Sequence, residues 1–205
     1  MAVNVKNAYV GRPPIDGGVF FRAPLGTTLP TDALDTLEGA FEDHGAVGEN
    51  GVAVNQTRSN TDIKMFGGDT FVTVQDNYDE ELVVTLLEDD RDAVIKTAFG
   101  DANVEKTEAT ETDGTKRVIY HTSDPLPISS FVVKSVYGEK TKTYVVERGQ
   151  VVSVGETRDV HTDVTRKELT IKTYKPVATE LKGGNVVEYR DDGTPTAPVD
   201  QGEEG

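Results

Sequence analysis

The sequence predicts a mainly β protein, with a β-sandwich or barrel-like domain and one flanking α-helix. Three observations lead to this fold class. Apolar and polar residues alternate over residues 128–175, which is the period of half-buried strands. Glycines stand where the alternation breaks, as tight turns require. Only one stretch, residues 89–99, has the spacing of an amphipathic helix next to a strand pattern. We therefore expect residues 128–175 to form the central sheet.

The central stretch is expected to be an up-and-down meander of four strands. Phe131 and Val133 fall on one face of a strand, and Leu169 falls on the apolar face of another. Tight turns are predicted at Tyr137–Lys140 and at Glu147–Gln150, because each contains a glycine at a break in the pattern. Four strands joined by short turns would then provide the platform for the rest of the chain.

The N-terminal part is predicted to begin with an extended arm, residues 1–16, because Pro13 and Pro14 disfavour a helix there. A short strand is expected at Val19–Phe21. Residues 23–39 form a long connection with two prolines, in which only Thr31–Leu37 could form a helical turn. Connections of this length are usually functional or are ordered by a partner.

Two turns and a loop are expected in the next part of the chain. Glu49–Gly51 contains Asn-Gly, which predicts a hairpin. The polar residues Asn55–Thr61 are predicted to form a loop tip. Gly67 and Gly68 separate two strand-like pieces, so we expect a turn or a bulge between them.

The one helix is predicted to follow a strand at Glu81–Glu88. It should run from Asp89 or Asp90 to Phe99, with acids in its first turn and Gly100 ending it. Its apolar stripe predicts packing across a sheet face. Residues 102–115 are expected to form two short strands or a loop, and Arg117–Tyr120 a further short strand.

The chain divides into three predicted parts. Residues 1–16 are the arm, residues 17–178 are one β domain, and residues 179–205 are an acidic tail. The tail is rich in glycine, proline and acid, a composition that predicts disorder.

The charge balance limits the partners that the chain is expected to have. It has 36 acidic and 21 basic residues and a net charge of −15, which argues against a surface that binds nucleic acid. Nine basic and six acidic residues give residues 128–175 a charge of +3, so the remainder carries −18. This asymmetry fits self-association between unlike patches, and it fits a solvated sheet face equally well. No apolar run approaches the length of a membrane span.

The sequence contains no pattern that indicates catalysis. Phosphate-binding, dinucleotide-binding and zinc-protease motifs are absent, and the absence of cysteine excludes thiolate chemistry and disulfides. His44, His121 and His161 lie far apart in the sequence. Asp159, His161 and Asp163 alternate as in an acid-oriented histidine, but a polar strand end is the simpler interpretation. We therefore expect no catalytic residue, no cofactor and no metal, and a structural role instead of an enzyme.

Five stretches, taken in order, resemble a known family. They are Tyr9–Pro13, Ala23–Leu34, Asp62–Asp69, Phe99–Val104 and Val152–Glu156. In this order and spacing they resemble the major tail protein of long-tailed phages of actinobacteria, and the resemblance covers roughly residues 7–178. The chain departs from the family pattern in the charged pair Asp43–His44, in the Thr- and Glu-rich residues 105–115, and in the acidic tail after Lys182.

The resemblance implies a tail tube protein. In that family, β-sandwich-like subunits form hexameric rings whose sheets join into a continuous β-barrel around a lumen, and the rings stack into a tube. The expected partners are further copies of the chain and other tail proteins (tape measure, tail tip and terminator). DNA would pass through the lumen without specific binding, which an acidic lumen favours because it repels phosphate. The expected location is the virion tail, after assembly in the host cytoplasm.

The long connection and the polar loop tip are the candidates for contacts between stacked rings, although both could be plain surface loops. The candidate residues are Leu25, Gly26, Thr27, Thr28, Leu29, Pro30, Thr31, Gln56 and Arg58. Two other classes of function stay open. A head-tail connector or tail terminator would form one ring and stop, and an acidic β-sandwich binding module would be a monomer.

Overall fold

The computed structural model describes residues 3–15 and 17–195. These residues contain ten strands, one α-helix and three short 3-10 helices, joined by loops. The strands are β1 (Phe20–Pro24), β2 (Glu42–Asp43), β3 (Val47–Lys64), β4 (Thr70–Leu86), β5 (Val104–Thr107), β6 (Lys116–Ile119), β7 (Ser129–Tyr137), β8 (Lys140–Val154), β9 (Lys167–Thr173) and β10 (Val187–Asp191). The helices are α1 (Asp92–Phe99), η1 (Val5–Asn7), η2 (Asp101–Asn103) and η3 (Thr179–Leu181). The predicted mainly β fold with one α-helix is confirmed.

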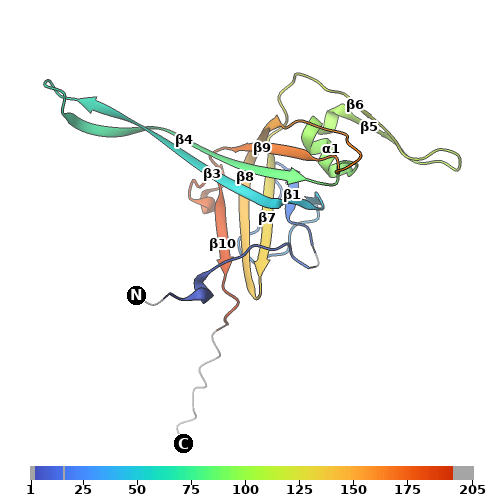
Figure 1. Ribbon diagram of the computed structural model, residues 1–205, viewed down its shortest axis with the longest axis horizontal. Helices are drawn as coiled ribbons and strands as arrows, with labels where there is room; N and C mark the ends of the chain where they lie inside the picture. Colours follow the sequence, from blue (N-terminus) through green and yellow to red (C-terminus); the bar gives the residue numbers. More distant parts are fainter. Residues whose placement is uncertain (1–2, 16, 196–205) are drawn as a thin grey trace, which may run out of the picture.

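Strand β8 is the centre of the main sheet (Figure 1). The strand order is β2-β1-β7-β8-β9-β4-β3, all neighbours are antiparallel, and β10 also pairs with β8. One edge of β8 pairs with β10 over residues 141–145 and with β9 over residues 149–154. The sheet therefore branches at β8, with β10 on one side of the branch point and β9, β4 and β3 on the other.

The prediction of four strands over residues 128–175 is wrong by one strand. The turn at Tyr137–Lys140 is present, and Gly138 has a φ of +62°. The second predicted turn is absent, because β8 continues through Gly149. A Cβ on Gly149 would lie 2.7 Å from the Phe131 ring and 2.9 Å from Ile171. Glycine is required there for close packing between strands and not for a turn.

Both faces of the sheet are covered near β7. The larger core cluster contains Phe20 of β1, Phe131 of β7 and Leu82 of β4, together with residues of β8, β9 and α1. Because strands from both ends of the sheet meet in one cluster, the sheet curves around this core in a barrel-like way. The smaller cluster lies on the other face, where Val132 and Val145 pack under residues of the 25–41 connection.

The helix α1 closes the larger core with Val94 and Ala98. It begins at Asp92, two to three residues later than predicted, and Gly100 follows it with a φ of +92°. The predicted helical turn at Thr31–Leu37 is absent. Instead, the Asp35 carboxylate accepts hydrogen bonds from the backbone N–H of Thr31 at 2.7 Å and of Asp32 at 2.9 Å, which stabilises an irregular turn.

Two predictions for the region before Lys64 are wrong. No hairpin forms at Glu49–Gly51, because β3 continues through it with a register shift between Val47 and Val52. Residues Asn55–Thr61, predicted to be a loop tip, lie inside β3. The reversal of the chain occurs at Gly67 and Gly68, as predicted, and both have positive φ. The polar composition of residues 55–61 hid the strand, because both of its faces are exposed there.

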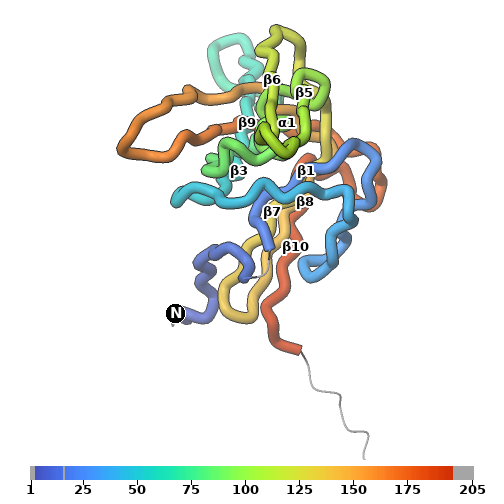
Figure 2. Tube along the Cα trace, turned by 90° about the vertical axis from the view of Figure 1, so that its right-hand side faces the viewer, coloured from blue at the N-terminus to red at the C-terminus, as the bar shows by residue number. Residues whose placement is uncertain are grey.

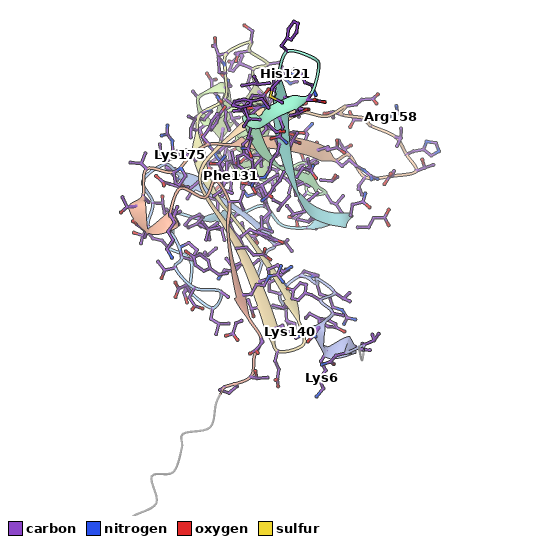
Figure 3. The ribbon with its side chains drawn as sticks, turned by 90° about the vertical axis from the view of Figure 1, so that its left-hand side faces the viewer. Lys6, His121, Phe131, Lys140, Arg158 and Lys175 are labelled. Carbon is purple, nitrogen blue, oxygen red and sulfur yellow. The ribbon has the colours of Figure 1, made fainter. Side chains whose placement is uncertain are left out.

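The two ends of the chain contact the sheet. In the arm, Arg12 forms a β-bridge with Val136, and the Lys140 ammonium donates to the carbonyl of Lys6 (Figure 3). At the other end, β10 belongs to the sheet, so the predicted disorder of the tail is wrong for Val187–Asp191. Residues 1, 2 and 16 of the arm and residues 196–205 of the tail lie outside the described residues.

Candidate assembly interface

Strands β3 and β4 form a hairpin that extends far beyond the rest of the sheet (Figure 1). Strand β9 pairs with β4 only over Glu81–Leu86, so the outer part of the hairpin has no neighbouring strand in the part of the chain that the structure describes. Every residue from 55 to 77 is exposed. An isolated two-stranded ribbon is marginally stable in water. We call residues 60–75 the distal hairpin.

Near the body, the hairpin has one apolar and one polar face. Val54 and Leu82 face each other across the two strands and belong to the larger core. The next pair, Asn55 and Glu81, lies on the opposite face, because successive side chains alternate. This is the usual pattern of a sheet that covers a core on one side.

The distal hairpin has the opposite pattern. After the register shift between Ser59 and Asn60, the pairs Thr61–Val74 and Ile63–Val72 continue the face that points away from the core. This face is polar near the body and apolar in the distal hairpin. Ile63 is 50% exposed, Val74 46% and Val72 40%. Apolar side chains thus gather on a face that no residue within 3–15 or 17–195 covers.

The core-side face of the distal hairpin is polar instead. The Asp62 carboxylate accepts a hydrogen bond from Thr73 at 2.7 Å, and the Lys64 ammonium donates to Thr70 at 2.6 Å and lies 3.4 Å from Asp62. The hydrogen bond from Thr73 is the largest of the interactions that lower the pKa of Asp62. The Asp62 carboxylate is therefore stable in its charged form, and this polar face can stay exposed to water.

The turn of the hairpin adds further apolar surface. Phe66 is fully exposed, Phe71 is 71% exposed and Met65 is 49% exposed. Single apolar residues on a surface are ordinary, but a contiguous group usually marks an interaction site. The distal hairpin therefore has the properties of a surface that is buried on another protein chain.

The base of the hairpin is fixed by polar contacts. The buried Glu80 carboxylate accepts hydrogen bonds from Gln56 at 2.7 Å and from the Tyr78 hydroxyl at 2.9 Å. Burial and the bond to Glu80 raise the pKa of Tyr78. The Arg58 guanidinium lies over the Tyr78 ring at 4.4 Å, a favourable cation–π geometry. Gln56 and Arg58, predicted to be in a loop tip, therefore brace the hairpin where it leaves the body.

The other predicted contact residues lie elsewhere, in the connection over the smaller core. Leu29 packs against that core and Pro30 is buried, so both support the fold. The Thr27 hydroxyl donates a hydrogen bond to the Pro24 carbonyl, and the Thr28 backbone N–H donates one to the Glu38 carboxylate. The remaining members, Leu25, Gly26 and Thr31, are exposed together with Thr28. A role of this connection in ring stacking stays a prediction.

The hairpin residues that the sequence analysis missed are Ile63, Met65, Phe66, Phe71, Val72 and Val74. A signal for them exists in the sequence. Ile63, Lys64 and Met65 alternate between apolar and polar before the glycine pair, and Val72, Thr73 and Val74 do so after it. Alternation predicts a strand with one covered face, but it does not show what covers that face.

The three histidines do not come together. His44 is buried, His121 stacks on the Phe99 ring at 4.4 Å, and His161 lies in the exposed 155–166 loop that projects from the body (Figure 2). Within the described part of the chain, no group of three or more His, Cys, Asp or Glu residues could hold a metal ion. In the same residues, no helix is long and apolar enough to cross a membrane.

No family model and no curated protein matches this chain. Among solved structures, it is similar to a sheath/tube terminator of the PVC extracellular contractile injection system in the extended state, with a TM-score of 0.39 and 9% identity over 88% of this chain and 99% of that chain. It is also similar to a chain of the sheath-tube complex of that system, with a TM-score of 0.37 and 8% identity over 90% of this chain and 94% of that chain. Both similarities are distant.

Proposed function

We propose that this chain is a structural subunit of a phage tail tube, which assembles into rings that stack around a central lumen. The hairpin would reach from one subunit onto the next and bury its distal apolar face there. A head-to-tail contact of this kind forms a ring when the rotations between successive copies add up to a full turn, and rings that contact one another build a tube. The other tail proteins expected from the family resemblance would contact the ends and the lumen of this tube in the virion.

The observation that carries this proposal is the inversion of the apolar face along the hairpin. Where a strand covers the core of its own protein, its apolar side faces that core. Here the apolar side changes at Ser59–Asn60, and Ile63, Val72 and Val74 point away from the core. A second chain must cover that side if it is to be removed from water.

The lumen is proposed to lie against the polar face of β4 and β9. Glu81 and Lys172 are paired on this face, and Thr85 and Glu168 are paired on the same face four residues further along the two strands. These positions alternate with the buried Leu82, Leu169 and other core residues, so their side chains point away from the core. Acidic side chains at the lumen surface would repel phosphate and let DNA slide.

The proposal is tested by negative-stain electron microscopy of the purified chain over a range of concentrations. Stacked hollow rings with six-fold end views are expected. Single rings that never stack would replace the proposal with a connector or terminator. Monomers that stay monomeric even with a tail-tip complex added would contradict it and favour a binding module.

A further inference from the structure

Strand β10 has one free edge. It pairs with β8 over Val187–Asp191, and among the described residues it pairs with no other strand. No backbone hydrogen bond of the described residues, outside that ladder, involves this strand. The outer edge of β3 is also free in the described part of the chain, where β3 pairs only with β4. Unpaired edges of this length readily accept another strand.

The two free edges carry matching patterns of residues. On β10, Glu188 and Arg190 lie on one face, and Val187 and Tyr189 lie on the other. On β3, Asp62 and Lys64 share one face, and Ile63 lies on the other. An antiparallel alignment of Glu188 with Lys64 also places Arg190 opposite Asp62 and Tyr189 opposite Ile63. Both charge pairs are then opposite in sign, and the apolar residues meet on the other face.

A parallel alignment with the same four charged residues opposite one another is less favourable. A parallel alignment that brings Glu188 beside Asp62 places Arg190 beside Lys64, so both pairs would have like charges. Like charges directly opposite each other destabilise a sheet, whereas opposite charges contribute favourably. Of these two alignments, the charges favour the antiparallel one with Glu188 opposite Lys64.

The faces of the two strands also agree with the fold. Glu188 lies beside Tyr144, on the side of β8 that faces the larger core, and Asp62 lies on the corresponding side of β3. Tyr189 packs on the smaller core. In this alignment, the apolar side of one copy's distal hairpin would continue the side of the other copy's sheet that carries the smaller core. It would lie next to that copy's connection, which contains the exposed Leu34. That connection is held close by, because Thr143, the register partner of Tyr189, donates to the Ala33 carbonyl at 2.9 Å.

We propose that the free edge of β10 accepts residues 61–65 of a second copy's β3 as an antiparallel strand, with Lys64 opposite Glu188 and Asp62 opposite Arg190. This inference rests on the proposed function, because it defines the contact between neighbouring subunits. It also explains the inversion of the apolar face, since that face would lie beside Tyr189 and Leu34 of the neighbour.

Cysteine cross-linking tests the pairing directly, because the chain contains no cysteine. The full-length variants K64C/E188C and D62C/R190C are assembled and then oxidised. Directly paired positions lie about 4.5–5.5 Å apart between Cα atoms, within the range of a disulfide. We expect both variants to shift from a monomer band to a ladder of dimers and higher species on non-reducing gels. The single variants and the register-shifted pairs K64C/R190C and D62C/E188C serve as controls.

The outcomes separate this inference from the proposed function. Rings or tubes that assemble but cross-link no better at 64/188 and 62/190 than at the shifted positions would overturn the pairing and leave the proposed function standing. A chain that never assembles, with unchanged residues as well as in the variants, would overturn the proposed function and the pairing with it. Cross-linking at both aligned pairs and not at the shifted pairs would establish the contact and its register.

Discussion

At the residue level, His44 joins three segments that lie far apart in the sequence. Its Nδ1–H donates to the Glu42 carbonyl at 3.0 Å, and its Nε2 accepts from the Thr97 hydroxyl at 2.7 Å. Arg22 donates to the same hydroxyl at 3.5 Å, so β1, the segment after β2 and α1 are connected. Burial lowers the pKa of His44 from 6.5 to about 4.

This shift predicts a pH dependence of stability. Between the two pKa values the unfolded chain binds a proton that the folded chain does not, so unfolding is favoured as the pH falls. The stabilisation from neutral His44 is complete above about pH 6.5 and is lost as the pH approaches 4. We expect a loss of roughly 3 kcal/mol over this range.

The measurement is urea unfolding of the natural chain and of His44→Gln at pH 7 and near pH 4. The difference in unfolding free energy between the two proteins should shrink by most of that amount at the lower pH. The carboxylates are common to both proteins, so their own titration cancels. Equal pH dependence in the two proteins would show that His44 is not buried in its neutral form.

Gly149 also acts at the residue level, and it shows why the number of central strands could not be predicted. A glycine that interrupts alternation is equally compatible with a turn and with close packing of neighbouring strands. The distinction depends on Phe131 and Ile171, which are distant in the sequence and approach Gly149 only in the folded sheet.

We expect Gly149→Ala to destabilise the fold by about 1–3 kcal/mol, because the new methyl group would overlap the Phe131 ring. Gly39→Ala is the matched control, since a Cβ at Gly39 meets nothing within 4 Å. Thermal and urea unfolding would measure both variants. An unchanged midpoint for Gly149→Ala would mean that the strands around it are packed differently.

At the level of elements, the sequence was informative wherever one face of a strand or helix is buried within the subunit. The positions of β7, β9, α1 and the 137–140 turn followed from alternation, helical spacing and glycine. The outer half of β3 and β4 could not be predicted in the same way, because neither face contacts the core. In the proposed assembly, a second chain covers its apolar face.

The distal hairpin offers a matched pair of variants on its two faces. Ile63→Ser with Val72→Ser removes one apolar cross-strand pair, and Asn60→Ser with Gln75→Ser changes a pair on the polar face. Both should leave the unfolding midpoint of the subunit nearly unchanged, within about 0.5 kcal/mol, because these residues are exposed. The first variant should raise the concentration needed for assembly at least about tenfold, which corresponds to about 1.4 kcal/mol.

Light scattering against protein concentration would measure this threshold. Equal thresholds for the two variants would show that the apolar face does not contribute to the contact between subunits. A large loss of stability in the first variant would instead show that Ile63 and Val72 are buried within the subunit.

At the level of the whole molecule, the excess of acidic residues gains a role in the proposed tube. The lumen hypothesis predicts that tubes of Glu81→Lys with Glu168→Lys retain short duplex DNA, and that higher salt releases it. Tubes of Glu81→Gln with Glu168→Gln, which lose the negative charges without gaining positive ones, should retain much less. Co-sedimentation of labelled DNA with assembled tubes would measure retention. Equal retention by both variants would place these residues outside the lumen.

The central claim is that the hairpin assembles the subunits, and one sedimentation velocity experiment tests it most directly. In the comparison variant, residues 59–77 are replaced by Asn-Gly, a two-residue turn that joins the paired residues Arg58 and Tyr78. The full chain should sediment as rings and tubes as its concentration rises, whereas the shortened chain should stay a monomer with an unchanged unfolding midpoint. Assembly of the shortened chain at the same concentrations as the full chain would contradict the account.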